Sequence, residues 1–402
     1  MAAASAQTAP PHDHAATTRT GPWHAMQDAV VFMTANHQDS ERGGDELAVQ
    51  NWWMGMASRQ AGNGILRVSL MFSLEPATLG KDGYRQIFQS GETVDDRPLI
   101  DRQHPHDFLM QASVVWSAPI GSNYILTLAG APVGEATLGP VAFMHRASAA
   151  NNPTAPLSHH TLDSTHIAMG VIAAGLERGR WRVEGSLFHG GEPDEQRWDL
   201  MDPGPLDSWA VRGWFRPSRE WSFQVSHGFL TQPEAHEIGD VRRTTASASW
   251  FKRRKNGWTA ATAAYGRNNK IGGDFNALVG EATHAFGPYT LYGRLESLQV
   301  ESDLLRFGRH GFIAGAKDGH VPDTGEGRDV VTMLTLGGAR TILRPRSWDV
   351  AAGADLAVYG VPNALKPFYG ERPLSFHVYL RVRPPVRAGA EMRMMESTMT
   401  QR

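Results

Sequence analysis

Segments in which apolar and polar residues alternate recur along the whole chain. In residues 65–75, Leu66, Val68, Leu70, Phe72 and Leu74 are separated by mostly polar residues. The same alternation returns at residues 181–189 and 374–383. A period of two places successive side chains on opposite faces, which is typical of β-strands and not of helices. The pattern therefore predicts an all-β protein.

We count sixteen such segments, most of them near the roughly 9–11 residues that a tilted strand needs to cross a bilayer. They are residues 26–37, 48–59, 64–75, 108–118, 122–131, 164–176, 180–189, 206–216, 220–230, 242–253, 257–266, 274–285, 288–298, 329–343, 348–360 and 374–383. Short connections alternate with long ones such as 76–107, 132–163, 299–328 and 361–373. This organisation predicts a closed antiparallel transmembrane β-barrel with short periplasmic turns and long extracellular loops.

Aromatic residues follow several of the short turns, as expected for the girdle at a membrane interface. They are Tyr124, Trp181, Trp221, Trp258, Tyr289 and Trp348. Charged residues occupy the opposite face of many strands, where a polar lumen suits them better than lipid. They are Arg67, Arg182, Arg212, Arg294, Glu296, Asp355 and Arg381. A soluble β protein is the alternative, and the repetition of turn and aromatic residue disfavours it.

Composition narrows the function classes further. The chain has 402 residues, a formal net charge of −2 and no cysteine, so disulfides, thiol catalysis and cysteine-ligated zinc are excluded. A near-neutral charge argues against nucleic acid as a partner, because nucleic-acid binding usually requires a basic surface. No run of about 18 apolar residues is present, which excludes a transmembrane helix.

The two ends of the chain lie outside the predicted barrel. Residues 1–25 are expected to be a disordered N-terminal segment, residues 26–383 the barrel, and residues 384–402 a C-terminal tail. Residues 4–6 have the small-x-small form of a signal-peptidase site, so we interpret the first residues as a remnant of signal-peptide removal. An alanine-rich disordered tail is the alternative.

Titratable residues concentrate in two stretches, 99–108 and 158–166, each just before a predicted strand. In the first stretch, Pro105 fixes the backbone between two histidines. With polar residues of the 132–163 loop, these stretches form the predicted polar cluster of the lumen. Its members are Asp101, Arg102, His104, His106, Asp107, Glu135, His145, Arg146, His159, His160, Asp163 and His166.

This cluster is open to two interpretations. Imidazoles and carboxylates could bind copper or zinc, and His104, His106 and His166 are the predicted ligands of such a site. A metal-free network that fastens the loops is the favoured interpretation, so no resident cofactor is expected.

Catalysis is disfavoured, and we predict that the chain is not an enzyme. No nucleophile-elbow, zinc-protease or phosphate-loop motif is present. The serine–histidine neighbours are Ser164 with His166 and Ser226 with His227. The second pair cannot act within one strand, because adjacent residues point to opposite faces.

In its architecture the chain resembles porin-like outer-membrane barrels of Gram-negative bacteria, over essentially all residues after Met26. It is also similar to an uncharacterised group of predicted outer-membrane proteins through residues 101–107, 143–146, 159–166 and 192–194. That group is loosely associated with heavy-metal, especially copper, contexts. In trimeric porins the loop that corresponds to residues 132–163 folds into the channel. A homotrimer and a monomer are both compatible with the resemblance.

We therefore expect an outer-membrane channel, surrounded by lipid, for passive diffusion of small hydrophilic solutes or ions. The alternatives are a copper- or zinc-binding outer-membrane protein linked to metal resistance and, less favoured, an outer-membrane hydrolase. If the two stretches converge, they should do so at the lumen. A strand that begins at Ser164 turns His166 inward and leaves Ile167 and Met169 available to face lipid.

Overall fold

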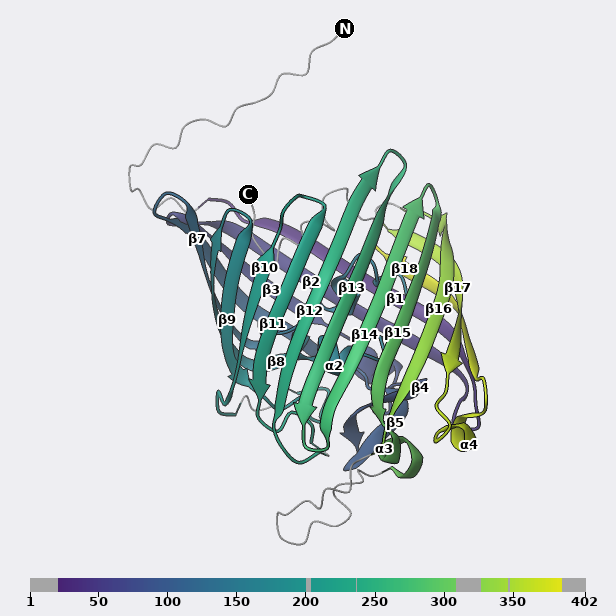
Figure 1. Cartoon of the computed structure of the whole chain (residues 1–402). Helices are drawn as coiled ribbons and strands as arrows, with labels where there is room; N and C mark the ends of the chain where they lie inside the picture. Colours follow the sequence, from purple (N-terminus) through teal and green to yellow (C-terminus); the bar gives the residue numbers. More distant parts are fainter. Residues whose placement is uncertain (1–20, 200–203, 236, 309–326, 346–347, 385–402) are drawn as a thin grey trace.

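The computed structural model describes residues 21–199, 204–235, 237–308, 327–345 and 348–384. Within these ranges, sixteen strands form a closed antiparallel barrel and two further strands form a separate small sheet (Figure 1). The expected disordered residues 1–20, with the signal-peptidase-like residues 4–6, and the tail from residue 385 onward lie outside the described residues.

The barrel strands begin two residues earlier than expected, at His24. They are β1 (His24–Asp39), β2 (Gly44–Ala61), β3 (Gly64–Phe72), β6 (Leu109–Ile120), β7 (Tyr124–Gly134), β8 (Ala168–Arg178), β9 (Trp181–His189), β10 (Ser208–Phe215), β11 (Trp221–Leu230), β12 (Val241–Arg254), β13 (Gly257–Lys270), β14 (Gly273–Phe286), β15 (Tyr289–Glu301), β16 (Arg328–Leu343), β17 (Asp349–Gly360) and β18 (Leu374–Arg383).

Each barrel strand pairs with its neighbours along the chain, and β1 pairs with β18 to close the barrel, with Val31 opposite Val382. Strand β3 pairs directly with β6, because β4 (Tyr84–Val94) and β5 (Arg97–Gln103) pair with each other in a separate hairpin that is not part of the wall. The predicted sixteen-stranded antiparallel barrel is confirmed. The hairpin was not predicted.

The wall separates apolar from charged side chains by the period of two. On β15, Leu291 and Leu295 are 54% and 56% exposed on the outer surface, while Arg294 and Glu296 are at most 2% exposed. A buried charged face and an exposed apolar face are the reverse of a soluble β-sheet and match a barrel in lipid. The predicted lumen-facing charges are all buried or half-buried.

The predicted aromatic girdle lies at the end of the barrel that carries the short turns, at the top in Figure 1. Of its six members, Trp181 is the most exposed at 60%, and its ring stacks on Phe215 at 4.2 Å between centroids. By the rule that short turns are periplasmic, this end faces the periplasm. At the other end, connections 40–43 and 271–272 are also short. The sequence predicted long connections at these two places. They are short because the strands on either side extend further than predicted.

Short helices accompany the connections. They are α1 (Glu75–Thr78), α2 (His159–Leu162), α3 (Ser302–Phe307), α4 (Lys366–Tyr369) and the 3₁₀ helices η1 (Phe143–His145) and η2 (Ser164–His166). No helix among the described residues combines the length and apolar character that a bilayer-spanning helix needs.

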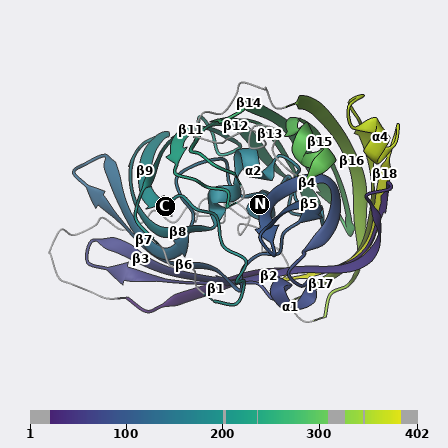
Figure 2. The ribbon, with the colours of Figure 1, turned by 90° about the horizontal axis from the view of Figure 1, so that it is seen from below.

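The lumen is filled mainly by residues 135–167, which we call the inward loop. Seen from the extracellular end, helix α2 of this loop lies within the ring of strands (Figure 2). Apolar residues of the loop pack on the inner wall, where Met144 and Ile167 join Met71 and Met110 in one buried cluster. The prediction that this long loop folds into the barrel is therefore confirmed by its contacts.

The start of strand β8 differs from the prediction. The strand begins at Ala168, so His166 lies in η2 before it. Ile167 and Met169 do not face lipid, because they are 6% and 1% exposed in the interior cluster. The register shifts between Met169 and Ile172, where Gly170 has a φ of 61°. This left-handed conformation is readily available to glycine, and it breaks the alternation on which the prediction relied.

Candidate functional site: the loop-filled lumen

A single buried arginine fastens the inward loop to the wall. The Arg146 guanidinium donates to Glu281 on β14 at 2.6 Å, to Asp163 at 2.7 Å and to the Val141 carbonyl at 2.7 Å. Arg146, Asp163 and Glu281 are at most 4% exposed. Burial alone would raise the pKa of Asp163, but Arg146 and His159 hold it well below its usual range. This group fixes the loop by charge-assisted hydrogen bonds.

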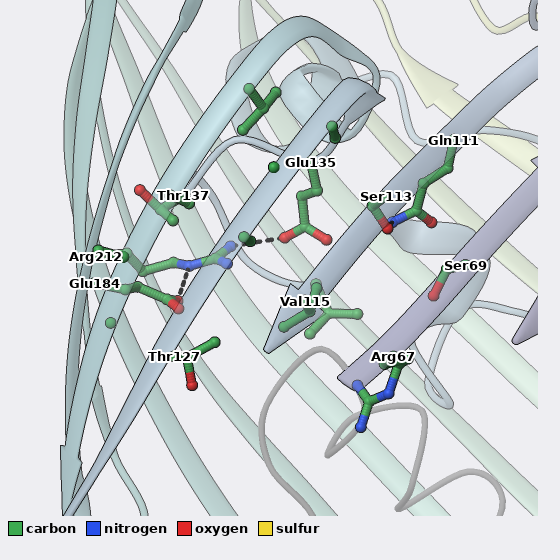
Figure 3. Close-up of a pocket in the computed structure, with 18 of the residues that line it drawn as sticks. Arg67, Ser69, Gln111, Ser113, Val115, Thr127, Glu135, Thr137, Glu184 and Arg212 are labelled. Carbon is green, nitrogen blue, oxygen red and sulfur yellow. Dashed lines mark hydrogen bonds and ion pairs between the residues drawn. The ribbon is translucent and has the colours of Figure 1, made fainter. Parts of the chain in front are cut away.

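A second charged group bounds a cavity in the half of the lumen nearer the periplasm. The Arg212 guanidinium donates to Glu184 at 2.7 Å and to Glu135 at 2.9 Å (Figure 3). The cavity, of about 140 Å³, is also lined by Arg67 and Arg182. Burial raises the pKa of Glu135, and Arg212 opposes this shift. Acidic and basic side chains therefore face the same cavity.

His145, predicted in the cluster, lines this cavity and packs edge-on against Trp52 at 4.9 Å between ring centroids. Burial and the nearby His106 lower its pKa to about 4. A further cavity of about 320 Å³, lined by Arg216, Glu220 and Trp221 among others, lies beside the periplasmic turns.

The two members of the predicted cluster on β5 lie apart from the histidines. Asp101 accepts hydrogen bonds from Arg42 at 2.6 Å and from the Tyr369 hydroxyl at 2.9 Å. Arg102 donates to the carbonyls of Asp82 and Gly83. The expectation that Asp101 joins the histidines was wrong. It instead ties the β4–β5 hairpin to the β1–β2 connection through Arg42 and to α4 through Tyr369.

The five remaining histidines of the cluster converge in the lumen. Their ring centroids form a continuous series, with separations of 5.7 Å between His106 and His166, 5.1 Å between His166 and His159, and 5.3 Å between His159 and His160. His104 lies 5.4 Å from His160 and 6.3 Å from His106. The structure thus brings histidines of the two stretches together, although the role predicted for them stays a prediction.

Three of these imidazoles are oriented through Nδ1. His106 Nδ1 lies 2.8 Å from Glu75 Oε2, and His159 Nδ1 lies 2.7 Å from Asp163 Oδ1. His166 Nδ1 lies 2.9 Å from the Asp163 carbonyl. An acceptor at Nδ1 assigns the proton to that nitrogen and leaves Nε2 with a free lone pair.

Several ring nitrogens of the cluster lack a hydrogen-bond partner. Among the described residues, the buried Nε2 atoms of His104, His106, His160 and His166 have no hydrogen-bond partner. Buried polar atoms without a partner are rare in folded proteins, so these nitrogens are candidate positions for ligand binding. Burial and neighbouring histidines also lower the pKa values of His104, His159 and His166. The neutral imidazole that a metal requires is therefore the favoured form of these three residues.

An acidic group borders the outer side of the histidines. Glu192 and Glu234 approach His160 Nδ1 at 3.4 Å and 3.3 Å. Burial alone would lower the pKa of His160, but these two carboxylates raise it well above its ordinary value. Arg197 forms ion pairs with Glu92 and with Asp107, the latter at 3.0 Å. Burial raises the pKa of Asp107 to about 6, and Arg197 opposes this shift.

Sequence reasoning missed the acidic residues that complete the cluster. Glu75 was assigned to a strand face, although β3 ends at Phe72. Glu192 was noted only within the resemblance over residues 192–194, and Glu234 carried no signal. These residues contact the histidines only because separate loops meet in the lumen. A local sequence pattern does not predict such contacts between distant parts of the chain.

Neither serine considered for catalysis is hydrogen-bonded to its neighbouring histidine. Ser164 Oγ accepts from Arg243 at 2.8 Å, and His166 Nδ1 faces the Asp163 carbonyl. Ser226 Oγ is 2.8 Å from Thr245 Oγ1, while His227 Nδ1 is 2.8 Å from Thr244 Oγ1. Since a nucleophile needs its base within hydrogen-bond reach, these pairs give no support to a hydrolase. The absence of enzyme activity stays a prediction.

Two solved structures share the architecture over nearly the whole chain. One is a loop-deletion mutant of OmpT, an outer membrane protein of Vibrio cholerae, with 9% identity and a TM-score of 0.50 over 90% of this chain and 99% of that chain. The other is OmpF of Salmonella typhi in complex with daunomycin, with 8% identity and a TM-score of 0.50 over 89% of this chain and 97% of that chain. No family model and no curated protein sequence matches the chain.

The comparisons and the outer surface agree on the class of protein. At this identity the comparisons show the fold alone, which is that of outer-membrane barrels of the porin type. The apolar outer face, with residues such as Leu295 and Val225 more than half exposed, fits contact with lipid. The chain is thus a closed β-barrel with the fold of outer-membrane barrels, and the predicted outer-membrane location agrees with this fold and with the apolar outer face.

Proposed function

We propose that this barrel is a channel for passive diffusion of small hydrophilic solutes or ions. The observation that carries the proposal is the charged cavity between the barrel wall and the inward loop, where Arg67, Arg182 and Arg212 face Glu135 and Glu184. Opposed charges around a narrow aqueous space orient a permeating solute and set selectivity.

The filling of the lumen restricts the size of the solute. The two cavities have volumes of about 140 Å³ and 320 Å³, and on this measure a cavity needs roughly 10–15 Å³ to hold one water molecule. On the extracellular side, the histidines and the β4–β5 hairpin occupy the lumen. We therefore expect slow passage of ions and of solutes no larger than a small sugar or amino acid.

Liposome swelling with a graded solute panel tests this proposal. Vesicles that contain the folded barrel should swell in small solutes and not in trisaccharides. The variant Arg67→Glu should keep the size limit and shift the reversal potential in a salt gradient toward cations, because it reverses one charge of the cavity. Swelling no faster than in protein-free vesicles would reject the channel.

A second candidate function is binding of a divalent metal such as copper or zinc. The observation that favours it is the set of buried, unpartnered Nε2 atoms, which includes the predicted ligands His104, His106 and His166. Titration of metal-stripped protein with Cu²⁺ and Zn²⁺, for the wild type and for the double variant His104→Ala, His106→Ala, tests this function. The absence of binding, with a lower melting temperature in the variant, would leave only a metal-free network.

A further inference from the structure

Three side chains from three separate loops meet on the extracellular side of the histidines. His160 comes from the inward loop, Glu192 from the β9–β10 connection and Glu234 from the β11–β12 connection. One ligand atom from each lies within 4.8 Å of the other two. The atoms are those that coordinate metals in proteins: one imidazole nitrogen and two carboxylate oxygens.

The separations of the three side chains match those of ligands that share one ion. His160 Nδ1 is 3.4 Å from Glu192 Oε2 and 3.3 Å from Glu234 Oε1. Two ligands held at about 2.1 Å from a tetrahedral metal are about 3.4 Å apart. His160 Nδ1 and both carboxylate oxygens of Glu192 are buried, and the described contact between the two side chains is an ion pair with no well-aligned hydrogen bond. The Glu192 side chain is only 10% exposed.

Contacts behind the three side chains hold them in place. The Glu192 backbone N–H donates to the Pro233 carbonyl at 2.9 Å, which joins the two acidic loops beside the cluster. The His160 carbonyl accepts from Arg243 at 2.5 Å and from Asn268 at 3.1 Å. These backbone contacts fix the positions of the two acidic loops and of helix α2, from which the three side chains project.

We propose that His160, Glu192 and Glu234 bind one divalent transition-metal ion, with His104 as the nearest further donor. The inference rests on the second candidate function and names a ligand set different from the three histidines predicted for it. The His104 and His160 ring centroids are 5.4 Å apart, near the roughly 5 Å expected for two imidazoles on one metal. Two carboxylates neutralise the charge of the ion, and the ion joins three extracellular connections.

A donor set of one imidazole nitrogen and two carboxylates favours some metal ions over others. Imidazole nitrogen favours zinc and copper over the hard cations, and three or four donors are too few for Ca²⁺, which takes 6–8 oxygen ligands. We therefore expect Zn²⁺ to bind and millimolar Mg²⁺ or Ca²⁺ not to displace it.

The experiment uses the full-length barrel, folded in detergent, stripped of metal and titrated with Zn²⁺ by calorimetry. The wild type should bind one Zn²⁺ per chain, and Glu192→Gln and His160→Ala should each weaken binding by about 100-fold or more. Matched controls are Glu195→Gln in the same loop and His284→Ala at the opposite end of the barrel, which should bind as the wild type does. The heat-induced gel shift verifies that each variant is folded.

X-ray absorption of the Zn²⁺-loaded wild type provides a readout that does not depend on variants. One or two imidazoles among oxygen ligands would support the assignment, whereas three or more imidazoles would place the ion among the other histidines and overturn it. Binding undiminished by Glu192→Gln and His160→Ala would also overturn it, while metal binding itself would stand. No binding by the folded wild type would reject both. None of these results depends on whether the barrel conducts.

Discussion

Replacement of Arg146 by alanine should release the inward loop from the wall. The substitution leaves the carboxylates of Glu281 and Asp163 buried without the guanidinium that both contact at 2.6–2.7 Å. Breaking a buried ion pair by removing one partner typically costs about 3–5 kcal/mol. Asp163 keeps its contact with His159 at 2.7 Å, whereas Glu281 has no other ion-pair partner among the described residues. We expect a loss of this size in the free energy of unfolding, measured by urea titration of tryptophan fluorescence in lipid vesicles.

Two comparison variants separate charge from packing. The double variant Arg146→Met, Glu281→Gln removes both charges of one pair, so it should be more stable than Arg146→Ala. Arg254→Ala, at an exposed periplasmic turn, should change stability by no more than about 0.5 kcal/mol. Single-channel conductance should rise in Arg146→Ala, because the loop no longer narrows the lumen. A stability within about 0.5 kcal/mol of the wild type would refute the role of Arg146 as the loop anchor.

Two further predictions address the wall and the interior. Leu295→Arg, on the lipid face of β15, should destabilise the barrel by about 2–4 kcal/mol, whereas the control Asn256→Arg, in a turn, should not. Equal effects of the two variants on urea unfolding would contradict the assignment of the outer face. Burial lowers the pKa of His145 to about 4, so the folded state binds fewer protons than the unfolded state between pH 4 and about 6.5. The free energy of unfolding should therefore fall as the pH drops through this range, by at most about 3 kcal/mol. His145→Phe should lose less stability over the same range, and identical pH profiles of the two proteins would exclude this contribution.

The sequence predicted the wall well because the wall repeats one physical rule. Each strand meets lipid on one face and the lumen on the other, so residues such as Leu295 and Glu296 reveal their positions by alternation alone. The prediction failed at Met169, where Gly170 takes a left-handed conformation and the register shifts. It failed again at residues 76–107, where the β4–β5 hairpin lies apart from the barrel wall and bears no membrane-facing alternation.

The candidate site could be predicted only in part. Titratable residues clustered near Pro105 and in residues 158–166 indicated a polar site, and five of the histidines do converge. Their partners Glu75, Glu192 and Glu234 lie on connections whose positions depend on tertiary packing inside the barrel. Asp101 was misplaced for the same reason, because its partners Arg42 and Tyr369 come from loops near the opposite ends of the sequence.

Conductance of the wild-type barrel in a planar lipid bilayer shows whether ions pass through the loop-filled lumen. Protein that shows the heat-induced gel shift of a folded barrel should insert and give small, stepwise increases in current. A narrowed lumen lined by Arg67, Arg212 and Glu135 predicts steps that depend on salt and are smaller than those of an open sixteen-stranded barrel. A folded, inserted protein that leaves the current unchanged would contradict the claim that the loop-filled lumen is a channel.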